Sequence, residues 1–155
     1  MESLKILQIV GFRHSGKTTL IKDWVKLCED QNKEVAVIRH HGPQKGLQLP
    51  PSKTESMVFY EADTKDSLLE QLINLTRIYE PSILFIEGFE EADYPKVVLV
   101  RNYDEWQFFK HVSNVVLIIW HDYDYDFHTV RKPLSFSRIQ TREINNWFKQ
   151  WMNSD

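Results

Sequence analysis

The sequence is short of cysteine, of long apolar runs and of features that would send it out of the cell. Its 155 residues include one cysteine, Cys28, so no disulfide can form within the chain, and a reducing compartment is indicated. No apolar run approaches the roughly 20 residues that span a bilayer. The apolar run that ends at Gly11 is too short for a signal sequence, and its flank is acidic. We therefore expect a cytoplasmic protein with no membrane segment.

An excess of charge of one sign is also missing. The 19 Lys and Arg residues face 22 Asp and Glu residues, which gives a formal net charge of -3. The basic residues are scattered along the chain, which argues against a face for nucleic acid or for acidic lipid. Hydrophobic residues make up 42% of the chain, as in ordinary globular proteins. We expect a single domain over residues 1–155 that binds neither nucleic acid nor membrane.

Apolar segments alternate with amphipathic ones along most of the chain. Segments rich in Val, Ile and Leu predict strands at 4–10, 35–39, 83–86, 96–101 and 115–120, and alternation predicts an edge strand at 134–137. Apolar residues at helical spacing predict helices at 17–28, 64–79, 104–112 and from 141 onward. In the helix at 64–79 we expect the core stripe to be Leu68, Leu72, Leu75 and Tyr79. Such alternation is typical of an α/β fold.

The link from Glu87 to Lys96 is short for a crossover between parallel strands, which normally takes a dozen residues or more. We therefore expect a mixed, mostly parallel sheet with one antiparallel return at this link. The apolar strand at 96–101 and the aromatic terminal helix are expected to leave hydrophobic surface that a second copy would cover.

Residues 11–18 read GFRHSGKT and match the Walker A pattern G-x-x-x-x-G-K-[ST] in full. The match follows a predicted strand and opens a predicted helix, so the backbone amides form an anion nest at the positive end of the helix dipole. Lys17 is expected to reach the β and γ phosphates of a nucleotide, and the Thr18 hydroxyl to ligate Mg²⁺. The sequence thus predicts a three-layer domain of the P-loop NTPase type. The expected nucleotide-binding residues are Gly11, His14, Ser15, Gly16, Lys17, Thr18 and Thr19.

Two further strand ends carry residues of interest. Glu87 ends the apolar strand at 83–86, where P-loop proteins place the acidic residue that serves the metal. We expect Glu87 to be a metal ligand, direct or through water, and with Lys17 a catalytic residue. Arg39, His40 and His41 end the second strand, beside the expected ligand crevice. For the two histidines, and for His14, a structural role and a contact to phosphate or partner both remain open.

Two segments resemble ligand-binding motifs but lack required residues. Residues 121–126 read HDYDYD, but they lack the glycine and the final glutamate of a calcium loop, so a solvated acidic turn is expected. Asn32-Lys33 resembles the start of the Asn-Lys-x-Asp guanine signature, but Val35 stands where the aspartate belongs. Neither segment is expected to bind a ligand.

Taken together, several segments resemble the MobB family. They read IVGFRHSGKTTL at 9–20, VIRHH at 37–41, ES at 55–56, EA at 61–62, FIEGF at 85–89 and PKVVLVR at 95–101. The resemblance implies a homodimeric P-loop protein that binds GTP with Mg²⁺ and hydrolyses it slowly. It also implies a guanylyltransferase partner of the MobA type, which attaches GMP to molybdopterin to form the dinucleotide molybdenum cofactor.

Two other functions compete with this reading. A small P-loop kinase would use the same phosphate cradle, with a basic lid over the transferred phosphate. The candidate lid residues are Arg131, Lys132, Arg138 and Arg142. A nucleotide-binding scaffold without useful turnover is the second alternative, and assays of phosphate release and transfer separate the three functions.

Overall fold

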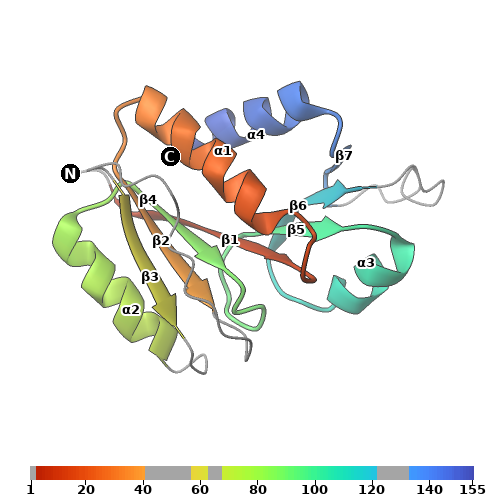
Figure 1. The fold of residues 1–155 in the computed structure, drawn as a ribbon, viewed down its shortest axis with the longest axis horizontal. Coiled ribbons are helices and arrows are strands. Elements are labelled where there is room, and N and C mark those ends of the chain that lie inside the picture. Colours follow the sequence, from red (N-terminus) through yellow and green to blue (C-terminus); the bar gives the residue numbers. More distant parts are fainter. Residues whose placement is uncertain (1–2, 41–56, 63–67, 122–132) are drawn as a thin grey trace.

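The computed structural model describes residues 3–40, 57–62, 68–121 and 133–155. In these residues one sheet has the strand order β3-β2-β4-β1-β5-β6-β7 (Figure 1). The strands are β1 (Lys5–Gly11), β2 (Val35–His40), β3 (Met57–Ala62), β4 (Ile83–Glu87), β5 (Lys96–Val100), β6 (Val115–Trp120) and β7 (Ser135–Ser137). All the described pairings between neighbouring strands are parallel.

Helices cover both faces of this sheet, which gives three layers (Figure 1). On one face lie α1 (Lys17–Asp30) and α4 (Thr141–Asn153). On the other face lie α2 (Leu69–Thr76), which continues into the 3₁₀ helix η2 (Arg77–Tyr79), and α3 (Tyr103–Phe109). The predicted α/β fold of the P-loop type is confirmed.

Side chains that alternate along a strand pack in hydrophobic clusters on opposite faces of the sheet. In β2, Val35 and Val37 pack in the cluster under α1 and α4, whereas Ala36 and Ile38 pack in the cluster under α2. Successive side chains of a strand point to opposite faces, and both faces are covered, so the buried residues 35–38 of β2 are all apolar. This explains why the strands appear in the sequence as continuous apolar runs.

The expected antiparallel return between Glu87 and Lys96 is wrong. Strands β4 and β5 lie on either side of β1 and are both parallel to it. They are staggered, because Glu87 at the end of β4 is level with Ile9, and Lys96 at the start of β5 is level with Gln8. The chain therefore crosses beside β1 without returning along the length of a strand, and a short link suffices.

The helix predicted at 64–79 ends differently, and its predicted start is not among the described residues. Residues 63–67 lie outside the described part, α2 ends at Thr76, and η2 follows with tighter winding. The buried residues of α2 are Leu69, Ile73 and Thr76, while Leu75 and Tyr79 of the predicted stripe are 47% and 53% exposed. The predicted stripe is wrong at Leu75 and Tyr79, whereas Leu72 is partly buried against the core. The fully buried face is displaced by one residue, about 100° around the helix, to Leu69, Ile73 and Thr76.

The terminal helix is a core element, as its aromatic residues indicated, but it does not leave the apolar surface that we expected. Phe148 of α4 is fully buried and stacks on Trp24 of α1, with ring centroids 4.4 Å apart. Every residue of β5 is buried as well. The sequence-based argument that these two elements need a second copy to cover them is therefore wrong.

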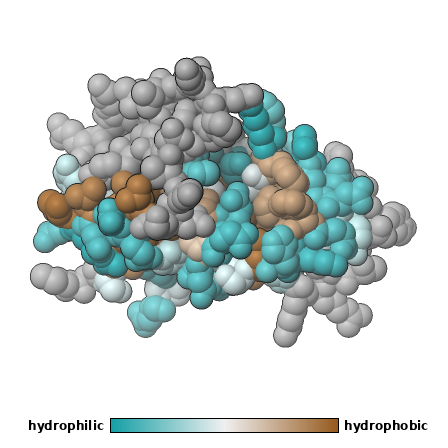
Figure 2. Space-filling model, turned by 90° about the horizontal axis from the view of Figure 1, so that it is seen from below, coloured by the Kyte–Doolittle hydropathy of each residue, from teal (hydrophilic) through white to brown (hydrophobic). Residues whose placement is uncertain are grey.

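Exposed apolar side chains lie elsewhere, including Ile139 just before α4 and several on the opposite face. Seen from below, hydrophobic colour gathers at the α2 side and again near the centre of the molecule (Figure 2). Ile78 of η2 is 72% exposed and Phe108 of α3 is 56% exposed. None of the helices in the described residues is long and apolar enough to cross a membrane.

Candidate nucleotide site

The Walker A segment forms a tight loop between β1 and α1. Gly16 has φ 98° and His14 has φ 64°, so two residues of the loop adopt left-handed backbone conformations. The Ser15 amide donates to the Phe12 carbonyl over 3.1 Å. A Cβ on Gly11 would lie 2.7 Å from the Leu99 carbonyl oxygen and 2.6 Å from Ser15 Oγ. Both glycines of the motif are thus required by the backbone, one for its conformation and one for close packing.

Lys17 folds back over this loop. Its Nζ donates to the Gly11 carbonyl over 2.6 Å and lies 3.4 Å from the Phe12 carbonyl. Burial lowers the pKa of Lys17 from its ordinary value, while the nearby carboxylates of Glu87 and Glu90 act to raise it. The ammonium is thus held by neutral carbonyls in a partly desolvated position, where an anionic phosphate would be a stronger partner.

Thr18 and Glu87 meet at the carboxyl edge of the sheet, as the sequence predicted. The Thr18 hydroxyl donates to Glu87 Oε1 over 3.3 Å. Glu87 is 7% exposed, and the Gly88 amide that follows it donates to the Ile9 carbonyl over 3.0 Å. A third side chain, Arg39, lies beside this pair, and its Nε is 3.1 Å from Glu87 Oε2.

The residues present fit a nucleoside triphosphate with Mg²⁺. Octahedral Mg²⁺ binds oxygen ligands at about 2.0–2.1 Å, which places neighbouring ligand oxygens about 3 Å apart. The oxygens of Thr18 and Glu87 are separated by 3.3 Å, and hydroxyl and carboxylate are the hard donors this cation prefers. In the described part of the chain, the Ser15 hydroxyl is buried without a hydrogen-bond partner, so the loop also has donor capacity to spare.

The predicted site residues divide into two groups by position. Gly11, Ser15, Gly16, Lys17, Thr18 and Glu87 come together around the loop and the end of β4. His14 and Thr19 are exposed on the outer side of the loop and of α1. The structure thus brings together the residues expected to form a phosphate cradle and a metal pair, while the roles of the individual residues stay predictions.

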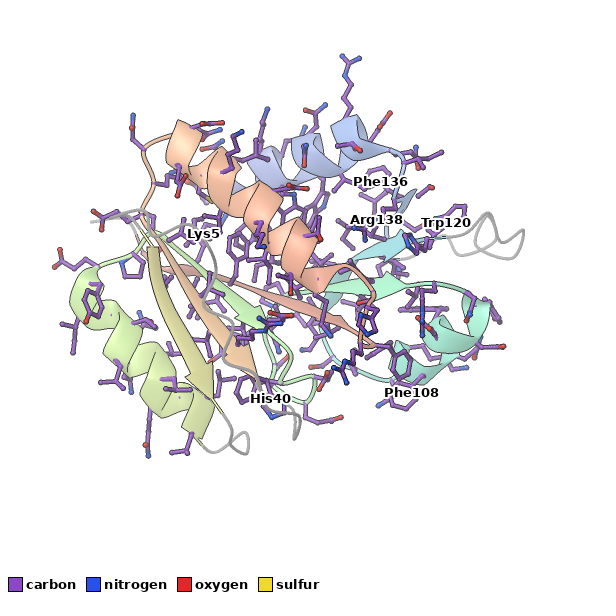
Figure 3. All side chains as sticks on the ribbon, viewed as in Figure 1. Lys5, His40, Phe108, Trp120, Phe136 and Arg138 are labelled. Carbon is purple, nitrogen blue, oxygen red and sulfur yellow. The ribbon has the colours of Figure 1, made fainter. Side chains whose placement is uncertain are left out.

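Arg138 contacts the loop in a way that the sequence did not predict. It follows β7, near Trp120 and Phe136 (Figure 3). Its Nη1 donates to the Ser15 carbonyl over 3.1 Å, and a Cβ on Gly16 would lie 1.9 Å from the same nitrogen. Arg138 therefore braces the loop through its backbone, and the lid that the rival kinase function would give it is not tested by this contact. No local sequence pattern signals a contact between residues this far apart.

Most of the other candidates for a lid or a ligand site lie outside the described residues. Arg142 is exposed on the first turn of α4, and Arg131 and Lys132 lie outside the described residues. Residues 41–56 and the acidic segment after His121 also lie outside them. Within the described ranges, no group of three or more His, Cys, Asp and Glu residues could hold a metal.

His40 has a structural contact. Its ring lies 4.8 Å from the ring of Phe89, and a Cβ on Gly88 would lie 2.8 Å from His40 Cβ. Gly88 therefore lets the end of β2 approach the turn after β4 closely. His41, its neighbour in the sequence, lies outside the described residues.

Comparison with known proteins gives the family. No family model matches the chain. A Bacillus subtilis protein named "Probable molybdopterin-guanine dinucleotide biosynthesis adapter protein" is 30% identical over 131 residues, which cover 74% of this chain and 75% of that protein. The chain belongs to the MobB family. A Methanocaldococcus jannaschii protein with the same adapter description is 26% identical over 150 residues, 84% of this chain and 61% of that protein.

Solved MobB structures share the fold along nearly the whole chain. The crystal structure of a MobB homolog from Bacillus stearothermophilus has a TM-score of 0.71 at 24% identity, and the match covers 97% of this chain and 99% of that one. Bacillus subtilis MobB has a TM-score of 0.68, also at 24% identity, over 94% and 96% of the two chains. A LAO/AO transport system kinase reaches 0.62 at 16% identity, over 95% of this chain and 59% of its own. At these identities the likeness establishes the fold that MobB proteins share with that kinase.

Proposed function

We propose that this MobB protein binds GTP with Mg²⁺ in its P-loop and acts as an adaptor in molybdopterin-guanine dinucleotide synthesis. The observation that carries the nucleotide part is the meeting of Thr18 with Glu87, 3.3 Å apart, beside a preformed phosphate loop. The adaptor role is supported by the names of its relatives. The guanine base is supported by the resemblance to the family.

Each residue of the loop has a defined task when the nucleotide binds. The amides between Gly11 and Lys17 donate to the phosphates, and the helix dipole of α1 adds to the attraction. Lys17 exchanges its carbonyl partners for the β and γ phosphates. Thr18 and Glu87 hold Mg²⁺, which would neutralise charge on the phosphates. Arg138 keeps the loop in shape through the Ser15 carbonyl.

Hydrolysis by the protein alone is proposed to be slow. The residues after Glu87 are Gly88 and Phe89, neither of which can orient a water molecule as a glutamine would. Gln8, in the neighbouring strand, uses its amide nitrogen to donate to the carbonyls of Gly88 and Phe89. Arginine fingers contribute about 10³–10⁵ in rate where they act. Arg138, the arginine near the loop from the C-terminal part, donates to the Ser15 carbonyl instead. Such a site suits binding with slow turnover.

The partners proposed are a second copy of the chain and a MobA-type guanylyltransferase, in the cytoplasm. A partner that senses the nucleotide would have to contact a surface beside the loop. The ring of Phe12 in the loop contacts the exposed Phe108 in a tilted arrangement, with ring centroids 5.0 Å apart. Figure 3 shows Phe108 on the same side of the molecule as His40. This aromatic contact offers a surface next to the phosphates for such a partner.

Replacing Glu87 with glutamine is expected to weaken the dependence of nucleotide binding on Mg²⁺. The substitution keeps the shape of the side chain but removes the charge that attracts the cation. We expect Mg²⁺ to strengthen GTP binding by about 10-fold less than in the wild type, which corresponds to about 1.4 kcal/mol of lost metal binding. Calorimetric titrations at several Mg²⁺ concentrations measure this. Glu105→Gln, a buried carboxylate in the α3 cap, is the matched control.

The adaptor role is tested in a strain that lacks the gene. We expect reduced activity of an enzyme that needs the dinucleotide cofactor, rescue by the wild-type gene and poor rescue by Lys17→Ala. Normal activity without the gene would contradict the role. In vitro, phosphate release without transfer to small acceptors separates this function from a kinase, and the absence of both would favour a scaffold.

A further inference from the structure

Arg39 brings a cation to the site that the Walker A motif does not contain. Its Nε lies 3.1 Å from Glu87 Oε2, and its Nη2 donates to Thr18 Oγ1 over 3.4 Å. These are the two side chains that we expect to ligate Mg²⁺. One guanidinium therefore contacts both expected metal ligands, and the Thr18 hydroxyl closes the network on Glu87 Oε1.

We propose that Arg39 is a positioning residue that takes the place of the metal ion in the nucleotide-free protein. Its guanidinium holds Thr18 and Glu87 together and neutralises the carboxylate. Arg39 must withdraw before the two oxygens can ligate Mg²⁺. This inference rests on the proposed nucleotide function, because the metal arrives with the nucleotide.

The sheet fixes Arg39 in this position. Strands β2 and β4 are neighbours, and Arg39 is the register partner of Glu87. The guanidinium presents its donors as a planar fork, which can contact two acceptors at once, whereas an ammonium is a single point charge. The pairing is therefore built by the backbone and by the shape of the side chain together.

The exposure of the two side chains indicates which residue of the ion pair can move. The Glu87 side chain is 9% exposed, and the Arg39 side chain is 32% exposed. Glu87 lies at the end of a buried strand, whereas Arg39 can turn its head group into solvent on its long aliphatic stem. Metal binding can thus displace the arginine while Glu87 and Thr18 stay where they are.

The exchange has a measurable consequence for the coupling between metal and nucleotide. Without metal, Arg39 screens the Glu87 carboxylate from incoming phosphates and thereby helps nucleotide to bind. With metal, the same contact must be broken, which reduces the gain from Mg²⁺. Arg39 should therefore lower the ratio of the GTP dissociation constant in EDTA to that in Mg²⁺, because both effects act in the same direction.

The test measures this ratio by calorimetry with GTP for the wild type, Arg39→Gln, Arg39→Lys and Arg77→Gln. We expect Arg39→Gln to raise the ratio about 3- to 10-fold, given a partly exposed ion pair. Arg39→Lys keeps the charge and should raise it less. Arg77→Gln removes an exposed arginine of η2 and should leave the ratio unchanged. Arg77 lies before the start of β4, whereas the site lies at the end of β4. Thermal melts of each variant check the fold.

The outcomes separate this inference from the function on which it rests. A wild type that binds GTP more tightly with Mg²⁺, together with a ratio in Arg39→Gln that is unchanged or lower, would overturn the role of Arg39 alone. A wild type that binds no GTP in either buffer would overturn the proposed function as well. A raised ratio in Arg39→Gln, with a smaller rise in Arg39→Lys, is the predicted result.

Discussion

Replacing Lys17 with alanine is expected to weaken GTP binding by about 10- to 150-fold. Lys17 Nζ is held by the carbonyls of Gly11 and Phe12 over the phosphate loop, so it can transfer to a phosphate with little movement. Charge-assisted hydrogen bonds of this kind contribute about 1.5–3 kcal/mol, which gives the expected factor. Isothermal titration of both proteins with GTP and Mg²⁺ measures the loss.

The fold should survive the Lys17 substitution, because the Lys17 side chain lies on the loop rather than in the core. Burial disfavours its charged form, as the lowered pKa shows, so alanine removes a desolvated charge. We expect a melting temperature within about 3 °C of the wild type, equivalent to about 1 kcal/mol or less. Lys22→Ala, at an exposed position of the same helix, is the control and should bind GTP normally. Wild-type affinity in Lys17→Ala would refute the role of the loop lysine.

Replacing Phe148 with alanine is expected to lower the free energy of unfolding by about 3–5 kcal/mol. Phe148 is fully buried and joins α4 to α1 by stacking on Trp24, and its ring also lies 5.6 Å from Phe85 of the sheet. Alanine would leave a cavity between the helical layer and the sheet. The loss should appear in urea unfolding followed by circular dichroism.

Phe108→Ala is the matched control for the core prediction, since it removes the same atoms from an exposed position. Phe108 is 56% exposed, and its ring contacts those of Phe12 in a tilted and Phe109 in an edge-on arrangement. We expect it to cost no more than about 1.5 kcal/mol, the value of an aromatic pair. Equal losses from the two substitutions would contradict the assignment of α4 to the core.

The candidate site could largely be predicted from the sequence, because its parts follow from local pattern and from the geometry of parallel sheets. The Walker A motif defines the loop and the start of α1. Glu87 ends an apolar strand, and parallel strands bring their carboxyl ends to one edge, so its approach to Thr18 was expected. The contact of Arg39 with Glu87 depends on which strands are neighbours, and no local sequence pattern predicts the order of the strands.

Features that depend on distant packing could not be predicted in this way. The stagger of β4 and β5 along β1, which makes all the described pairings parallel, is a property of register. Strand β3 went unnoticed in a segment where no strand was expected. The brace from Arg138 to Ser15 joins residues separated by 123 positions. In each case the decisive neighbour is far away in the sequence.

The claim that this MobB protein is a guanine nucleotide binder is tested most directly by titrating the purified wild type with GTP and with ATP in Mg²⁺. The account predicts one GTP bound per chain, with ATP weaker by at least about 10-fold, a difference of about 1.4 kcal/mol. Addition of EDTA should weaken GTP binding, because Thr18 and Glu87 then lose the metal that links them to the phosphates. No binding of GTP, or tighter binding of ATP, would contradict the account.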